Sequence, residues 1–237
     1  MSSVELPRVS DFQRVVFFTG AGMSAASGVP TYRGKGGIWK SYDYEAYACQ
    51  EAFDRDPAAV WEFHNYRRQL VGECEPNEGH ALIARCEAAQ PAVTIVTQNI
   101  DGLHQSAGSK RVLELHGSLW GVRCDGTGER RLSRDIPFAG RRADGLWWRP
   151  DIVWFGDMLR DDVIQSALDL IGQCDLFVSI GTSAVVFPAA RMPFYARQGG
   201  ATLVEINPEE TPVSHLYDVC ARESAVDALR RMCHGLD

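Results

Sequence analysis

Four short apolar runs, each followed directly by small or polar residues, constrain the fold of this chain more than any other sequence feature. The runs cover residues 15–19, 93–97, 176–180 and 201–206 (VVFFT, VTIVT, LFVSI and ATLVEI). Each is almost entirely apolar, which is typical of strands that helices cover on both faces. The runs therefore predict a parallel sheet in an α/β domain.

The residues that follow these runs indicate where a ligand binds. Ligands of open parallel sheets bind outside the carboxyl ends of the strands. Here those ends carry segments that suit a polar crevice, namely Gly20-Ala21-Gly22, Gln98-Asn99-Ile100-Asp101, Gly181-Thr182-Ser183 and Asn207-Pro208-Glu209. One such ending carries little information, but four together favour a nucleotide site.

The remaining segments predict helices and one irregular insertion. Residues 57–71, 79–89 and 161–174 carry apolar side chains at helical spacing. Residues 124–149 are rich in Arg, Asp and Gly and show little periodicity, which favours an irregular insertion. The 237 residues are enough for one large domain with a smaller module inserted in it.

Charge and hydropathy disfavour several classes of partner. The formal net charge of -7 disfavours a nucleic-acid-binding surface but is compatible with a basic peptide substrate. No run approaches the roughly 20 apolar residues that cross a bilayer, and the N-terminus lacks the apolar stretch of a secretory signal. We therefore expect a cytoplasmic protein with neither membrane nor nucleic-acid partners.

The seven cysteines are widely spaced and include no CxxC pair. An odd count at such spacing predicts reduced, mostly buried thiols and disfavours a disulfide framework. A four-cysteine zinc site normally takes its ligands from close pairs of cysteines. No zinc or other metal is therefore expected.

The glycine loop at residues 20–25 departs from that of a hydride-transferring dehydrogenase. It fits the pattern G-x-G-x-x-A after a strand, where glycines let the backbone approach a pyrophosphate, although a plain turn is the alternative. An ordinary dinucleotide fold continues with a full helix and a second strand that ends in an acid. Here Ser27-Gly28-Val29-Pro30 ends the helix early, and a basic, glycine-rich loop follows at residues 31–37. This pattern favours chemistry on the cofactor's ribose.

Six ordered motifs resemble those of the sirtuin (Sir2-like) family of NAD-dependent protein deacylases. They are GAGMSAASGVPTYRGKGGIW, TQNIDGLHQSAG, LELHGS, RPDIVWFGD, IGTSAVVFPAA and VEINPEETP, and they extend from about residue 15 to about residue 229. The resemblance implies a Rossmann-like parallel sheet with helices on both faces and a small inserted module. It assigns residues 1–34, 90–120 and 150–237 to the NAD-binding domain, 35–89 to a helical insertion and 121–149 to the remnant of a zinc module.

The resemblance also implies a reaction that consumes NAD. The acyl oxygen of a modified lysine attacks C1′ of the nicotinamide ribose, nicotinamide leaves, and a ribose hydroxyl then attacks the acyl carbon. The products are free lysine, nicotinamide and O-acyl-ADP-ribose. Such chemistry needs a base near neutral pH, a task that suits histidine, and His116 matches the family base. Asn99 and Asp101 match the pair that orients the nicotinamide ribose and carboxamide.

Other residues match the family's cofactor and substrate sites. The implied cofactor contacts are Gly20, Ala21, Gly22, Ser24, Ala25, Thr31, Tyr32, Arg33, Trp39, Gln98, Asn99, Ile100, Asp101, Gly181, Thr182, Ser183, Asn207, Pro208, Glu209 and Ala221, the last under the adenine. An acyl-lysine peptide would pair with Val153, Trp154, Phe155 and Gly156. Phe155 and Val186 would flank the lysine tunnel, with ordinary core packing as the alternative for both.

The first departure from the family concerns zinc. Most sirtuins carry two CxxC pairs, but only Cys124 remains of them here, and Arg141 and Asp144 stand where the second pair should lie. Thiolates hold zinc in such sites, and most of them are absent here, so the module must be held together by packing. Leu119, Trp147 and Trp148 are the candidates for that packing.

The second departure concerns the acyl group. Sirtuins that remove acidic acyl groups carry a Tyr-x-x-Arg arrangement, whereas here His64 takes the tyrosine place and Arg67 the arginine place. Arg67 can bind a carboxylate with two hydrogen bonds, or it is a solvated helix arginine. His64 would become cationic near a pKa of about 6.5, and if it helps to bind the carboxylate, selectivity for succinyl over acetyl should rise as the pH falls from about 8 to about 6. The alternative is that the missing tyrosine hydroxyl matters more and that uncharged acyl groups are preferred.

Two other functions would use the same pocket. An ADP-ribosyltransferase or NAD glycohydrolase is disfavoured by His116, because plain hydrolysis does not need that base. A non-catalytic NAD-binding regulator is disfavoured because Asn99, Asp101 and His116 are all present.

Overall fold

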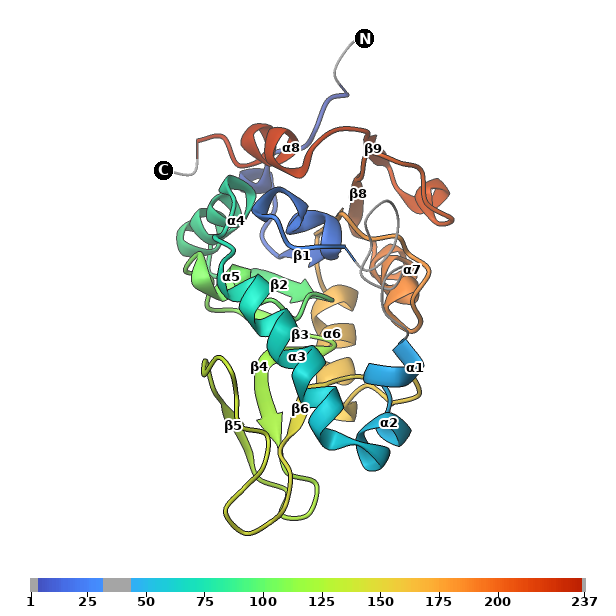
Figure 1. Cartoon of the computed structure of the whole chain (residues 1–237). Helices are drawn as coiled ribbons and strands as arrows, with labels where there is room; N and C mark the ends of the chain where they lie inside the picture. Colours follow the sequence, from blue (N-terminus) through green and yellow to red (C-terminus); the bar gives the residue numbers. More distant parts are fainter. Residues whose placement is uncertain (1–3, 32–43, 236–237) are drawn as a thin grey trace.

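The computed structural model describes residues 4–31 and 44–235 of the chain (Figure 1). Its large sheet has six parallel strands in the order β3-β2-β1-β7-β8-β9. The strands are β1 (Val15–Thr19), β2 (Val93–Thr97), β3 (Val112–Glu114), β7 (Leu176–Ile180), β8 (Thr202–Ile206) and β9 (Val219–Ala221). The direction of strand addition reverses between β1 and β7, as in a Rossmann fold.

The four predicted strands are the four central strands of this sheet. In the register of the sheet, Phe17 of β1 lies between Ile95 of β2 and Val178 of β7, and all three are fully buried. The edge strands β3 and β9 were not predicted from the sequence. Each has three residues and is only partly buried, so neither produces a recognisable apolar run.

Helices cover both faces of the sheet, which confirms the predicted fold class. On one face, α4 (Glu78–Ala89) and α8 (Ala225–Met232) place Ile83 and Leu229 against Phe17. On the other face, α6 (Asp161–Gly172) and α7 (Met192–Gln198) place Ile171 and Met192 against Phe177. The sequence-based division assigns α4 to the helical insertion, but its apolar side chains belong to the core of the large sheet.

A second, smaller body contains α1 (Tyr44–Tyr47), α2 (Gln50–Arg55), α3 (Pro57–Gly72) and an antiparallel sheet. That sheet has the order β5-β4-β6 and is built from β4 (Gly117–Arg123), β5 (Arg130–Leu132) and β6 (Arg149–Ile152). Figure 1 places these three strands at the end of the molecule opposite α8. Residues 124–149, predicted to be irregular, form β5, an isolated bridge between Arg141 and Trp147 and the first residue of β6, and otherwise turns and loops.

Packing between arginines and aromatic rings holds the module to α3. The buried Arg68 donates from Nε to the Leu119 carbonyl at 3.0 Å and from Nη1 to the Asp135 carbonyl at 3.2 Å. Its guanidinium lies 5.0 Å from the Phe138 ring centroid and 5.4 Å from that of Trp61. Leu119 and Trp148 are buried in the same core and Trp147 packs against it, as predicted.

Short helical turns connect the larger elements. They are α5 (Leu103–Ser106) and the 3-10 turns η1 (Val9–Asp11), η2 (Ala21–Met23), η3 (Ala25–Ser27), η5 (Ala189–Arg191) and η6 (Ser214–Leu216). Among the helices of residues 4–31 and 44–235, none combines the length and apolar character needed to span a membrane.

Candidate active site

A cavity of about 1420 Å³ runs along the carboxyl ends of the central strands. Its lining includes the residue after each of them, with Gly20 following β1, Gln98 following β2, Gly181 following β7 and Asn207 following β8. The cavity continues toward the small module, where α3 and the segment after β6 form its wall. The strand ends therefore converge on one crevice, as the sequence predicts.

The glycine loop contains the 3-10 turns η2 and η3 where the sequence suggested a short helix. Its glycines are needed for contact with the neighbouring loop after β7. A Cβ on Gly22 would lie 2.6 Å from the Gly181 Cα, and one on Gly20 would lie 2.8 Å from the Gly181 carbonyl oxygen. Gly22 N–H donates to that same oxygen at 2.9 Å. The two loops thus interlock at the switch point of the sheet, the place where open α/β sheets generally bind their ligands.

Asn99 is held at the cavity wall by two hydrogen bonds of its side-chain amide. Nδ2 donates to the Gly20 carbonyl at 3.0 Å and to Ser24 Oγ at 3.2 Å. Both donors of the amide are therefore used within the protein, which fixes its orientation. Asn99 is only 4% exposed but contributes to the cavity lining.

Asp101 and Ser24 lie behind Asn99 and do not line the cavity. Ser24 Oγ donates to Asp101 Oδ2 at 2.7 Å, and the other carboxylate oxygen accepts from Leu103 N–H at 2.9 Å. Burial raises the pKa of Asp101, while these two hydrogen bonds oppose that rise. Asp101 thus acts on the cavity through Ser24 and not by direct contact.

His80 completes this group from the N-terminus of α4. Its Nδ1 accepts from Asn77 N–H at 3.2 Å, so the neutral ring carries its proton on Nε2, which lies 3.4 Å from Ser24 Oγ. Burial lowers the pKa of His80 to about 4, so the ring is neutral at physiological pH. Sequence reasoning did not identify His80, because its partner Ser24 lies 56 positions away in the chain.

His116 lies at the start of the small module and faces the cavity. Its Nδ1 lies 3.0 Å from the Gln98 carbonyl oxygen, which can only accept, so Nδ1 carries the proton and Nε2 is left as the basic nitrogen. Burial lowers the pKa of His116, and the hydrogen bond to Gln98 opposes that shift. The ring is therefore neutral, and able to accept a proton, at neutral pH.

His64 and Arg67 both line the cavity from α3. His64 is 1% exposed, and its ring lies 5.9 Å from the Trp154 ring and 5.3 Å from the Phe63 ring. Burial, and next the positive charge of Arg67, lower the pKa of His64 well below 6.5, although the Tyr47 backbone carbonyl opposes the shift. The expectation that His64 becomes cationic between about pH 8 and 6 is wrong, because it took the solvated value for a buried ring.

The segment after β6 forms the wall opposite the glycine loop. Val153 N–H donates to the His116 carbonyl at 2.9 Å, and Phe155 N–H donates to the Ala48 carbonyl at 3.0 Å. Phe155 is 41% exposed and lines the cavity, which disfavours simple core packing for this residue. Val186 lines the cavity from the loop after β7.

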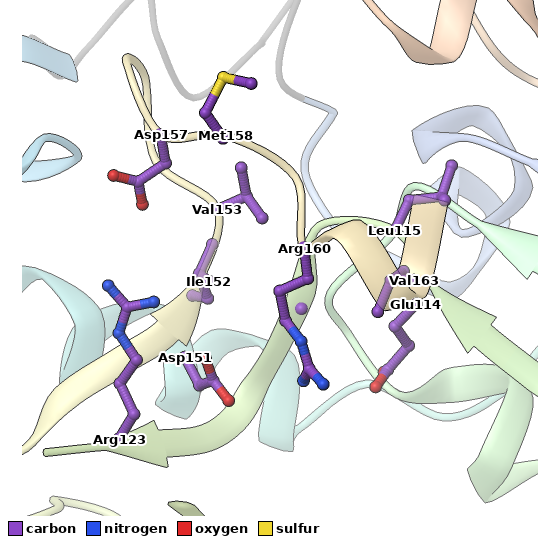
Figure 2. A pocket seen from close by; sticks show the side chains of 11 residues that line it. Glu114, Leu115, Arg123, Asp151, Ile152, Val153, Asp157, Met158, Arg160 and Val163 are labelled. Atoms are coloured by element: carbon purple, nitrogen blue, oxygen red, sulfur yellow. The ribbon is translucent and has the colours of Figure 1, made fainter. Parts of the chain in front are cut away.

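A second hollow of about 240 Å³ lies behind this segment (Figure 2). It shares Ile152 and Val153 with the large cavity, and Figure 2 shows charged side chains around it. Four of these charged residues are in ion pairs, since Asp151 contacts Arg130 at 2.5 Å, Arg160 contacts Asp162 at 2.6 Å, Arg123 contacts Asp125 at 2.9 Å and Asp157 contacts Arg149 at 2.5 Å. Glu114 also lines the hollow, and burial raises the pKa of its carboxyl group.

Most of the predicted site residues line the large cavity. Beyond those already placed, they include Ala21, Ala25, Thr31, Ile100, Thr182, Ser183, Pro208, Glu209, Trp154 and Gly156. Ala221 is buried in β9 away from the cavity, and residues 223–226 at the start of α8 line it instead. Tyr32, Arg33 and Trp39 lie outside the described residues. Met158 and Phe187 also line the cavity but were not predicted, since single exposed apolar residues carry no sequence signal.

The strand order, the glycine loop and the crevice at the switch point define a Rossmann-like nucleotide-binding protein. The model of the Sir2 family matches residues 20–188, and the chain belongs to this family. The resemblance seen in the sequence motifs is thereby confirmed.

Relatives and solved structures agree with this family. The chain is 44% identical over 223 residues to an NAD-dependent protein deacylase of Aquifex aeolicus (strain VF5), covering 92% of this chain and 93% of the relative. It is 46% identical over 209 residues to NAD-dependent protein deacylase 1 of Caldanaerobacter subterraneus subsp. tengcongensis, covering 85% and 86%. A mutant Sir2 homologue in complex with ADP-ribose superposes with a TM-score of 0.91 at 36% identity, covering 96% and 93%. A Sir2 homologue in complex with NAD gives a TM-score of 0.88 at 35% identity, covering 99% and 97%.

Proposed function

We propose that this chain is an NAD-dependent protein-lysine deacylase that consumes NAD and releases nicotinamide, O-acyl-ADP-ribose and free lysine. The observation that carries the proposal is the geometry of His116. A neutral imidazole with its basic nitrogen directed away from the Gln98 carbonyl lines the same cavity as the four strand ends. The names of the relatives support the same activity.

In the proposed reaction, NAD lies along the strand ends, with its pyrophosphate beside the glycine loop. Asn99 meets the nicotinamide ribose and carboxamide with its side-chain oxygen, because its Nδ2 is already engaged by Gly20 and Ser24. Asp101 keeps Ser24 in place from behind. When NAD is bound, it supplies the electrophilic C1′ to which the acyl oxygen adds.

His116 acts after nicotinamide has left. Its Nε2 takes a proton from a ribose hydroxyl, so that the hydroxyl oxygen can attack the acyl carbon. The carbon–nitrogen bond to lysine then breaks, lysine leaves as the free amine, and a water molecule adds to the acyl carbon to complete O-acyl-ADP-ribose. The Gln98 carbonyl stabilises the imidazolium that results, because Nδ1–H continues to donate to it. The lowered pKa of His116 keeps the base unprotonated before this step.

The acyl-lysine peptide binds as an extended strand against residues 153–156. The N–H groups of Val153 and Phe155 already donate within the protein, so the peptide's N–H groups pair with carbonyl oxygens of this segment. Such main-chain pairing does not depend on the peptide's side chains, so many peptide sequences can bind. Phe155 and Val186 form apolar walls around the aliphatic part of the lysine.

The acyl group extends toward His64 and Arg67, and an acidic group such as succinyl is preferred. Arg67 is only 8% exposed and lines the cavity, so a carboxylate bound there would be largely shielded from water. The neutral His64 ring supports this preference as a hydrogen-bond donor, without adding charge.

Incubation of the protein with NAD and acetyl- or succinyl-lysine peptides, followed by mass spectrometry, tests this function. Deacylated peptide together with O-acyl-ADP-ribose is expected. Ribosylated peptide or free ADP-ribose would favour the transferase or glycohydrolase, and an unchanged mixture would favour a regulator. His116→Ala should lower deacylation by about 10²–10⁴-fold in folded protein, the usual loss for a positioned acid–base group. Asn99→Ala should also abolish deacylation in folded protein, because it removes the group that orients the nicotinamide ribose.

A further inference from the structure

Three buried polar side chains that do not line the cavity are joined by hydrogen bonds beneath Asn99. Thr19 ends β1, Thr97 ends β2, and His104 lies in α5; none is more than 2% exposed. Thr19 Oγ1 lies 2.8 Å from Thr97 Oγ1 and 3.0 Å from His104 Nε2. Asn99 N–H donates to Thr97 Oγ1 at 3.0 Å. The proposed reaction leaves these three residues without a role.

The hydrogen bonds among Thr19, Thr97 and His104 run in one direction. Thr19 Oγ1–H donates to Thr97 Oγ1, and a hydroxyl has only one proton, so Thr19 must accept from His104 Nε2–H. Burial lowers the pKa of His104 to about 3, which keeps the ring neutral with a single N–H. His104 Nδ1 has no hydrogen-bond partner in the described part of the chain. The ring thus supplies one donor, and that donor points to Thr19.

The hydrogen bonds among these three side chains hold two of the groups that fix Asn99, the Thr97 hydroxyl and the Gly20 carbonyl. Thr19 and Thr97 are paired in the sheet register, so their hydroxyls join the ends of β1 and β2 directly. The backbone of Asn99 is held by Thr97, and its side chain is held by the carbonyl of Gly20, the residue after Thr19. A shift between the two strand ends would therefore move the Asn99 amide relative to its ligand.

We propose that Thr19, Thr97 and His104 form a hydroxyl relay that positions Asn99 for cleavage of the nicotinamide–ribose bond. The proposal rests on the proposed function. Thr19, Thr97 and His104 are positioning residues, since they act on the cofactor only through Asn99. Valine would fill either threonine position with nearly the same volume, so a change from threonine to valine removes the hydroxyl with little change in packing volume.

The test compares Thr19→Val, which removes the hydroxyl, with Thr19→Ser, which keeps it. Ser179→Ala is the matched control, because Ser179 carries a buried hydroxyl in β7 of the same sheet but takes no part in the hydrogen bonds of the two threonines. Exchange of labelled nicotinamide into NAD in the presence of acyl peptide measures cleavage of the bond before His116 acts. Thr19→Val should lower the maximal exchange rate by about 10- to 100-fold, as a small misplacement does, and should change the KM for NAD much less. Thr19→Ser should recover most of that loss, and Ser179→Ala should exchange as wild type does.

The relay is overturned if folded Thr19→Val exchanges nicotinamide at the wild-type rate, or if Thr19→Ser loses as much as Thr19→Val. If Thr19→Val does not fold, His104→Gln, which keeps a donor near Nε2, is compared with His104→Leu in the same assay. A wild-type protein without exchange or deacylation would overturn the proposed function and the relay with it. Active wild type with an unaffected Thr19→Val overturns the relay alone.

Discussion

His116 donates Nδ1–H to the Gln98 carbonyl, and this hydrogen bond decides which ring nitrogen is available as a base. Because burial lowers the pKa of His116, its basic form should persist below the usual histidine pKa of about 6.5. We expect kcat/KM to be level at neutral pH and to fall only as the pH passes through the lowered pKa. A pH–rate profile with a fixed peptide measures this midpoint. A midpoint above about 6.5 would contradict the assigned environment of His116.

The proposed preference for acidic acyl groups depends on Arg67. A hydrogen bond to a charged group contributes about 1.5–3 kcal/mol, so Arg67→Met should reduce desuccinylation by about one to two orders of magnitude. Deacetylation should change little, since an acetyl group has no carboxylate to lose. Arg67→Lys keeps the positive charge but loses the planar guanidinium, so its desuccinylation rate should lie between those of wild type and Arg67→Met. Comparison of kcat/KM for matched succinyl and acetyl peptides gives the result, and equal losses of both activities would make Arg67 structural.

Local motifs made some single residues predictable and left others out of reach. Asn99 and His116 follow apolar runs in recognisable motifs, so their place at the cavity follows from the sequence. The relay was not predicted, because Thr19 and Thr97 are 78 positions apart and look like ordinary strand ends. The low pKa of His64 was missed for a related reason, since it depends on the rings of Trp154 and Phe63 around it.

At the scale of elements, α3 connects the cavity to the small module through Arg68. Arg68→Met would leave the Leu119 and Asp135 carbonyls without this donor, and each such loss costs about 1–3 kcal/mol. At about 2–4 °C per kcal/mol for a chain of this size, the Tm should fall by roughly 4–24 °C. Calorimetry measures the shift, with Arg55→Met in the exposed end of α2 as the control. A Tm equal to that of the control would show that packing alone holds the module.

The turn after β4 is closed by backbone hydrogen bonds and ion pairs. Cys124 N–H donates to the Glu129 carbonyl at 2.9 Å, and Arg142 contacts Glu129 at 2.6 Å and Asp144 at 3.0 Å.

We expect purified protein to contain no zinc and to keep its activity after treatment with a strong chelator, because no CxxC pair exists to bind the metal. Elemental analysis that finds one zinc per chain would refute this expectation.

Apolar periodicity was sufficient to predict the long, buried helices and strands from the sequence, but it did not reveal the short ones. The four central strands and helices α3, α4 and α6 lie where the sequence placed them, to within a few residues. The strands β4 and β6 were missed because their residues pack against aromatic and arginine side chains of α3, a partner that periodicity does not reveal. The same partnership explains how 124–149 can be ordered with so few apolar residues.

At the scale of the whole molecule, the cavity has one wall from the large sheet and one from the module, and buried polar groups join the two. Leu119 N–H donates to the Ile100 carbonyl at 2.8 Å, and Trp120 Nε1 donates to the Asp101 carbonyl at 2.7 Å. The loop that carries Asn99 is therefore bonded to both bodies. A change in the module, such as Arg68→Met, should reach the cavity through β4.

The stability of the whole chain should depend on pH through its buried histidines. Burial lowers the pKa of His80 to about 4 and that of His104 to about 3, and their rings lie 4.9 Å apart. Below the unfolded-state pKa of about 6.5, the unfolded chain binds protons that the folded chain does not. Stability from these two groups is therefore complete above that pH and is lost as the pH falls toward the folded-state values.

By pH 4.5 each of these histidines should lower the free energy of unfolding by about 2.5 kcal/mol relative to pH 7.5. Asp101, whose pKa burial raises, acts in the opposite direction, so the total loss mixes several groups. His104→Gln isolates one of them, because glutamine keeps a donor for Thr19 but does not titrate. Urea unfolding at pH 7.5 and 4.5 should show a loss about 2.5 kcal/mol smaller for His104→Gln than for wild type. Equal losses in the two proteins would mean that His104 is already protonated in the folded chain at pH 4.5, and the low pKa assigned to its buried ring would then have to be abandoned.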